Sequence, residues 1–234
     1  MVARVSRSKS LEILDILNSF YSLRRLEVLL GIPYQVLWRY INLLNDPEEK
    51  TAEKIVETVK RLRLLEKAAE EAYEKFEGDI YRLARYAGFI KLCSLLIESA
   101  VKELGVNYVY SASSEALPLA SAVAVKLEAE VCPITCYFRC EGKGVATIHY
   151  ISRAHGEIRF ITVPKSCLQS ERKAIIVDIV VDDLDKLSAL KTLMAKFKVK
   201  PLALVALQTQ HSILELEKLE LGEVKILYPW SSQR

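Results

Sequence analysis

Residues 22–40 constrain the fold most, because they have the pattern of two short helices joined by a tight turn. Leucines recur at helical spacing in the first half, and Ser22 can cap that helix with its hydroxyl. Gly31 supplies the free backbone rotation that a tight turn needs, and Pro33 stands where a second helix begins. The segment therefore predicts a helix-turn-helix.

The second of these helices separates an apolar side, which would face inward, from a polar and aromatic side. In the major groove, Gln pairs well with adenine and Arg with guanine. We therefore predict that this helix binds double-stranded DNA. The residues expected at base edges are Gln35, Trp38 and Arg39, and those expected at phosphates are Tyr34 with Arg24 or Arg25.

Basic charge gathers in the same part of the chain. The formal net charge is +3, and the six basic and three acidic residues up to Asn45 account for that whole surplus. Because phosphate attraction depends on local basic contacts, this asymmetry favours DNA binding. An ordinary helical hairpin that contacts another protein is the alternative, and the salt dependence of binding would distinguish the two.

The length and hydropathy of the chain limit its class. Its 234 residues suffice for two small domains, and 51% of them are hydrophobic, as in a soluble globular protein. Charges interrupt every apolar run before it reaches the length of a membrane span. The first residues lack the apolar segment of a secretory signal. We therefore expect a cytoplasmic protein with no membrane partner.

The cysteines do not predict disulfides or a metal site. An odd number of cysteines in a chain without an export signal argues against a disulfide framework. Three of them are spaced by four in a strand-like stretch, so neighbouring thiols would lie about 13 Å apart, too far to share one metal ion. We expect buried thiols, no metal and no other cofactor. The five cysteines are Cys93, Cys132, Cys136, Cys140 and Cys167.

The chain divides into three predicted parts. Residues 1–50 form the all-α helix-turn-helix domain, and residues 51–78 form a linking helix, without an internal Gly or Pro up to Phe76. From residue 79 to 234, strand-like and helix-like segments alternate. This alternation predicts an α/β domain with a mostly parallel sheet and flanking helices.

In the order of its elements, the segment 79–230 resembles a type I phosphoribosyltransferase domain. Residues 106–120 are similar to the family's first strand, pyrophosphate-binding loop and helix entry, here Leu-Pro-Leu-Ala. The hairpin 145–163 lies where the family has its flexible loop. Residues 172–179 are similar to the strand that introduces the loop for phosphoribosyl pyrophosphate. With its N-terminal part, the chain resembles archaeal transcriptional regulators that join a helix-turn-helix to such a domain.

The chain departs from the family at that loop. The family's two adjacent acids contact the ribose hydroxyls, and the next loop, rich in Thr and Gly, holds the 5′-phosphate. Here Ile179 follows Asp178, and residues 181–186 contain three carboxylates and no Gly. If Asp182 and Asp183 serve as the acid pair, the loop still lacks Gly. A phosphate charge about 4 Å from a carboxylate costs about 1 kcal/mol even in water. We therefore predict no catalytic residues and no enzyme.

A ligand could still lie between residues 113–118 and the hairpin 145–163. We expect His149 at the surface, as one of several donors that an anion could use. Those donors are Arg139, Lys143, His149, Arg153 and His155. The candidate ligand-binding residues are Ser113, Ser114, Glu115, Asp178, Asp182 and Asp183.

The sequence therefore favours a sequence-specific DNA-binding transcriptional regulator. Its phosphoribosyltransferase-like domain would be catalytically inactive, form a homodimer and sense a nucleobase or nucleotide. Two helix-turn-helix units on a two-fold axis would read two half-sites about one DNA turn apart. The alternative is an active phosphoribosyltransferase with an added regulatory domain.

Overall fold

The computed structural model describes residues 2–135 and 144–227. The chain forms two compact units, Met1–Leu92 and Cys93–Arg234. The finer division at residues 50 and 78 stays a prediction. The longest helix in the described residues has 17 residues, and none of these helices combines the length and apolarity needed to cross a bilayer.

The N-terminal unit is helical, and its core is built from the apolar sides of its helices. Among its buried side chains are Leu14, Leu17, Leu26, Leu37 and Ile55. The helices are α1 (Val2–Asn18), α2 (Leu23–Leu30), α3 (Tyr34–Ile41), α4 (Glu49–Leu62), α5 (Leu64–Lys75), α6 (Ile80–Leu83) and α7 (Ala87–Val101), the last of which continues into the second unit.

The expected single helix over residues 51–76 is wrong, because the chain breaks at Arg63. This residue has a left-handed φ of 51° and separates α4 from α5. The change of direction lets α5 bury Leu64, Ala68 and Ala72 on its own apolar side. No Gly or Pro stands at the break, so helix propensity alone did not predict it.

The connection between α2 and α3 has the local structure that its residues predict. The hydroxyl of Ser22 accepts a hydrogen bond from the Arg25 backbone N–H at 3.3 Å, which caps α2. Gly31 ends that helix with a left-handed φ of 65°, and its N–H donates to the Glu27 carbonyl at 2.9 Å. The first residues of α3 follow directly after Pro33.

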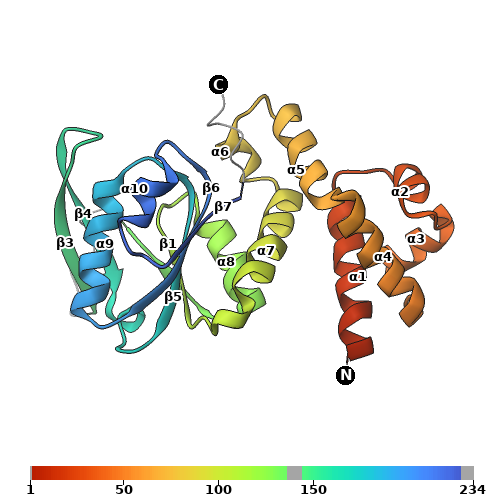
Figure 1. The fold of residues 1–234 in the computed structure, drawn as a ribbon, viewed down its shortest axis with the longest axis horizontal. Coiled ribbons are helices and arrows are strands. Elements are labelled where there is room, and N and C mark those ends of the chain that lie inside the picture. The colour runs from red at the N-terminus through yellow and green to blue at the C-terminus, as the bar shows by residue number, and fades with distance from the viewer. Residues whose placement is uncertain (1, 136–143, 228–234) are drawn as a thin grey trace. The chain divides into compact units, whose positions relative to one another are not determined.

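The C-terminal unit contains a five-stranded parallel sheet in the order β2-β1-β5-β6-β7. In Figure 1, α8 lies on one face of this sheet, and α9 and α10 lie on the other. The predicted α/β fold with a mostly parallel sheet and flanking helices is therefore confirmed. The elements are β1 (Tyr108–Ser111), α8 (Leu117–Leu127), β2 (Glu130–Pro133), β5 (Lys173–Val181), α9 (Leu184–Lys196), β6 (Lys200–Thr209), α10 (Ile213–Glu217) and β7 (Glu223–Ile226), with short 3₁₀ turns at Lys102–Leu104 and Lys165–Cys167.

Strand β5 is the centre of this sheet because its sequence is almost continuously apolar. Every residue of β5 after Lys173 is buried, as expected for a strand covered on both faces. Asp178 is the one charged residue within that buried run. A carboxylate at such a position needs partners inside the protein.

A separate two-stranded hairpin packs against the start of α9. Strands β3 (Val145–Ser152) and β4 (Glu157–Pro164) pair antiparallel along their whole length. One isolated bridge, from Thr135 to Thr162, links this hairpin to the segment after β2. An isolated hairpin has little stability in water, so its position depends on contacts with its neighbours.

The expectation that all cysteines are reduced is wrong for one pair. Cys132 on β2 and Cys167 after β4 form a disulfide across 35 residues of sequence. Tertiary structure brings together two cysteines that are distant in sequence, which their spacing could not show. Cys93 is buried, and Cys136 and Cys140 lie outside the described residues.

The turn between α2 and α3 gives a first prediction. Gly31→Ala should lower the free energy of unfolding of the N-terminal unit by about 1 kcal/mol, because an added Cβ meets no atom there but the left-handed φ becomes unfavourable. Gly31→Asn should cost less, since Asn tolerates this conformation. Denaturant titration of both variants measures the difference, and equal stability of Gly31→Ala and the wild type would contradict it.

Candidate functional site

The candidate site lies where β1 and β5 end, at the carboxyl edge of the parallel sheet. Ser111 pairs with Val177, so the residues that follow the two strands lie close together. The Ser113 hydroxyl donates to the Asp178 carboxylate at 2.6 Å. Ligands of open α/β sheets bind outside this edge. The fold thus brings together two of the predicted ligand-binding residues.

Asp178 is held by an ion pair inside the protein. Its carboxylate lies 3.0 Å from the Lys186 ammonium on α9, and the two residues are 1% and 9% exposed. The Ile179 backbone N–H donates to the same carboxylate at 2.9 Å. Buried charges require such pairing and hydrogen bonding. The carboxylate of Asp178 is therefore neutralised by Lys186 within the fold.

Asp183 caps α9 and is 2% exposed. One of its carboxylate oxygens accepts the backbone N–H groups of Asp185 and Lys186 at 3.0 and 3.1 Å. The other accepts the Ser152 hydroxyl at 2.7 Å and the Tyr150 hydroxyl at 3.5 Å. The positive end of a helix favours an anion at this position. The chain places its own carboxylate there.

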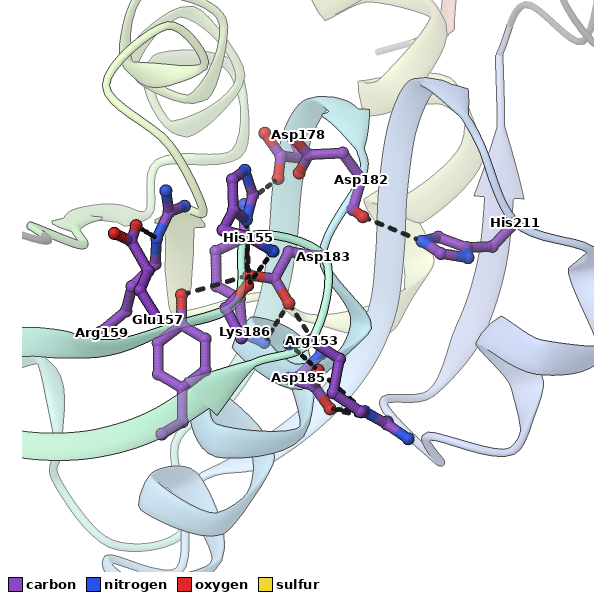
Figure 2. Close-up of polar contacts among 12 residues, drawn as sticks. Arg153, His155, Glu157, Arg159, Asp178, Asp182, Asp183, Asp185, Lys186 and His211 are labelled. Atoms are coloured by element: carbon purple, nitrogen blue, oxygen red, sulfur yellow. Dashed lines mark hydrogen bonds and ion pairs between the residues drawn. The ribbon is translucent and has the colours of Figure 1, made fainter.

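The turn that joins β3 to β4, residues 152–156, lies against this carboxylate (Figure 2). Arg153 forms a bidentate ion pair with Asp185 of α9, with contacts of 2.7 to 3.1 Å, and its backbone N–H also donates to Asp185. The hydrogen bond from this guanidinium lowers the pKa of Asp185. His155 Nδ1 lies 2.9 Å from the Ser152 hydroxyl and 3.7 Å from Asp183. We call residues 152–156 the hairpin turn.

The other predicted ligand-binding residues are more accessible. Ser114 and Glu115 are exposed and hydrogen-bond to each other at 2.9 Å. Asp182 is half-buried, and among the described residues its carboxylate takes part in no hydrogen bond, whereas its backbone carbonyl lies 3.1 Å from His211 Nε2. His149 is exposed, as predicted. Arg139 and Lys143 lie outside the described residues.

Sequence reasoning missed Lys186, Ser152 and Tyr150 as members of this site. Lys186 is the third residue of α9, where a lysine normally faces solvent, and its partner is on the preceding strand. Ser152 and Tyr150 belong to a hairpin whose packing partner cannot be read from its own pattern. A buried acid in an apolar strand was the one signal that a partner must exist.

The predicted DNA-contacting residues of α3 share one exposed side. Tyr34, Gln35, Trp38 and Arg39 are all exposed, with Tyr34 and Trp38 at 45% and 47%. Leu37 and Tyr40 are buried on the opposite side. Tyr34 and Trp38 thus place two aromatic rings on the exposed side of α3.

The two arginines expected at phosphates have different surroundings. Arg24 is exposed, whereas Arg25 makes a bidentate ion pair with Glu71 at 2.6 and 2.8 Å and stacks on the Tyr21 ring at 4.2 Å. Burial, and then the Glu71 carboxylate, raise the pKa of Tyr21 to about 12. Arg25 thus already has an anionic partner in this unit.

The Lys186–Asp178 pair gives a prediction for stability. Lys186→Met should lower the free energy of unfolding of the C-terminal unit by about 3 to 5 kcal/mol, because it leaves a buried carboxylate without its cation. Lys191→Met is the matched control on the same helix. It breaks an exposed pair with Glu220 at 2.6 Å and should cost at most about 1 kcal/mol. Equal costs for the two variants would contradict this account.

No family model and no curated protein matches this sequence. Solved structures do match, and several of them are adenine phosphoribosyltransferases. The enzyme from Giardia lamblia, solved with 9-deazaadenine, is 17% identical, with a TM-score of 0.54 over 63% of this chain and 82% of that chain. The enzyme from Thermoanaerobacter pseudethanolicus is 12% identical, with a TM-score of 0.55 over 63% and 84%. The enzyme from Rhodothermus marinus is 14% identical, with a TM-score of 0.53 over 61% and 80%.

These matches contradict the expectation that the chain is not an enzyme. That expectation rested on the three carboxylates and the missing Gly of residues 181–186, yet several solved structures that share the fold are enzymes of phosphoribosyl transfer. At these identities the likeness shows the fold alone: the sheet and its flanking helices are arranged as in these phosphoribosyltransferases.

Proposed function

We propose that this chain is a phosphoribosyltransferase with an added N-terminal regulatory unit. The observation that carries the proposal is the phosphoribosyltransferase fold together with the accessible polar groups at its carboxyl edge, Ser114, Glu115 and Asp182. The substrate class would be a nucleobase with phosphoribosyl pyrophosphate. The adenine enzymes that share the fold make adenine the first base to test.

The N-termini of α8 and α9 lie at this edge, and they differ in how their N-cap residues are used. The start of α9 is filled by the Asp183 carboxylate, whereas the N-cap of α8, Ala116, provides no side-chain hydrogen bond. Residues 113–115 precede α8, where the Ser113 hydroxyl donates to Asp178 and accepts the Ala116 backbone N–H, and the exposed Ser114 hydroxyl donates to Glu115. Helix starts attract phosphate groups. We therefore assign the pyrophosphate group to the turn before α8.

Asp182 is the carboxylate best placed to receive ribose hydroxyls. It is half-buried directly after β5 and, within the described residues, its carboxylate oxygens are not engaged in hydrogen bonds. An ionised carboxylate accepts hydrogen bonds from two hydroxyls. Hydrogen bonds to a charged group are stronger than those between neutral groups.

Asp182→Asn tests this assignment. The wild type should convert adenine and phosphoribosyl pyrophosphate to the nucleoside monophosphate and pyrophosphate, and Asp182→Asn should lower kcat/KM about tenfold because a charged acceptor is lost. Glu220→Gln, an exposed acid on the same unit, is the control and should be unaffected. If adenine, guanine, hypoxanthine and uracil all yield no product, the proposed activity is wrong.

A second function, binding of double-stranded DNA through α3, is favoured by the exposed side chains of that helix. Gln35 and Arg39 offer groups that recognise bases, and Trp38 adds an exposed ring. In this proposal a homodimer would place two copies of α3 at two half-sites, and a nucleobase or nucleotide bound by the second unit would be the effector. The proposal makes the added unit a transcriptional regulator.

The specific DNA site is first identified by selecting the fragments that the protein binds from random duplex DNA. The selection is run with and without adenine and phosphoribosyl pyrophosphate. Arg39→Ala should then weaken specific binding by about 1 to 3 kcal/mol if Arg39 contacts a guanine. Lys67→Ala, an exposed change on α5, is the control. Unchanged discrimination by Arg39→Ala between specific and random DNA would overturn the assignment, and salt-insensitive binding would instead indicate a protein partner.

A further inference from the structure

Strand β3 has one edge that, in the described part of the chain, no other strand covers. Its eight residues pair with β4 in one unbroken antiparallel register. The two strands form a sheet of their own, separate from the five-stranded sheet. The isolated bridge to Thr135 is made by Thr162, which belongs to β4. Among these residues, the edge of the hairpin along β3 is therefore open.

The register shows which backbone groups point to this open edge. In an antiparallel pair, residues that bond to the partner strand alternate with residues whose N–H and C=O face away from it. Thr162 exchanges both of its backbone hydrogen bonds with Thr135, at 2.9 and 3.1 Å, so its groups face away from β3. Thr147 lies directly opposite Thr162 and must likewise face away from β4. The two-residue period of a strand extends this orientation to Val145, His149 and Ile151.

This edge lacks the features that normally prevent strand pairing. Exposed edge strands are usually short, bulged, or protected by charged residues or Pro. Strand β3 is eight residues long and contains no Asp, Glu, Lys, Arg or Pro. The side chain of Ile151 is 68% exposed, and Ile158, opposite it on β4, is 65% exposed. Such an edge is a template for another strand.

The open edge is complementary to a second copy of itself. A two-fold axis at Ile148 would pair two copies of β3 antiparallel and would use all four residues that face outward. Val145 would then lie opposite Ile151 of the partner subunit, and Thr147 opposite His149 of the partner subunit. Apolar residues thus meet apolar ones and polar residues meet polar ones, which is how cross-strand pairs stabilise a sheet. A patch that contacts its own copy is also the commonest form of symmetric contact.

We propose that the open edge of β3 is a homodimer interface, at which two copies of the hairpin join into one four-stranded antiparallel sheet. The backbone groups of residues 145, 147, 149 and 151 form its hydrogen bonds. The proposal does not depend on phosphoribosyl transfer. It names a surface for the homodimer that DNA binding through α3 would use.

The experiment compares the full-length wild type with Ile151→Pro and Ile158→Pro by sedimentation equilibrium. The two isoleucines are cross-strand partners of nearly equal exposure, and the N–H groups of both face away from the hairpin. Pro lacks this N–H and cannot stand inside a sheet, but it is tolerated where the N–H faces solvent. The two variants therefore alter the hairpin alike, and only Ile151→Pro blocks the edge of β3. Melting followed by circular dichroism verifies that both are folded.

The wild type should be a dimer at micromolar concentration, and Ile158→Pro should match it. Ile151→Pro should raise the Kd of the dimer at least about tenfold, because both symmetric halves of the contact lose a hydrogen bond. Thr147→Lys, which keeps the backbone N–H and adds a charge that protects edge strands, should also raise this Kd. It replaces Ile151→Pro if that variant does not fold.

Three results would overturn the interface. A monomeric wild type would show that the edge does not pair. A dimer that Ile151→Pro and Thr147→Lys leave intact would place the contact elsewhere. Equal dissociation by Ile151→Pro and Ile158→Pro would show that the edge of β3 is not the determinant. Because mass is the readout, each result leaves the proposed activity to its own assay.

Discussion

The ion pair between Asp178 and Lys186 links the central strand of the sheet to the helix that follows it. A carboxylate in the middle of an apolar, fully buried strand is unfavourable unless a cation reaches it. Lys186 reaches it only if α9 starts within a few residues of the end of β5 and lies on that face of the sheet. The pair thus fixes the β5–α9 junction, and the candidate site is arranged around this junction.

Three of the carboxylates at the junction each interact with a different partner. Asp178 is paired with a lysine, Asp183 with helix N–H groups and a hydroxyl, and Asp185 with an arginine. Asp182, between them, keeps an uncommitted carboxylate in the described part of the chain. Four carboxylates within eight residues can therefore coexist without large mutual repulsion, because a cation or hydrogen-bond donors offset the charge of each paired carboxylate. Their environments also differ enough to give them different roles.

The sequence predicted the elements of the fold better than it predicted their contacts. The α8 helix, the β3–β4 hairpin and the buried strand β5 follow from local patterns of hydrophobicity and turn residues, and these are close to where they were expected. The break at Arg63 and the Cys132–Cys167 disulfide depend on tertiary packing, which no local pattern carries. For the site, the acids were recognisable from their number and position. The sequence did not identify their partners Lys186, Ser152 and Arg153, because the packing of strands and helices determines each partner.

The disulfide encloses the hairpin β3–β4 in a covalent ring with the edge of the sheet. The bond joins residues on either side of β3 and β4, so the whole hairpin belongs to a covalent ring. A ring of this size limits the conformations of the unfolded chain, which stabilises the folded unit by about 4 kcal/mol in the chain-entropy description. The bond therefore ties the end of β2 to the segment that follows β4. Reduction of the disulfide would remove this restraint, which couples the stability of the C-terminal unit to the thiol chemistry of its surroundings.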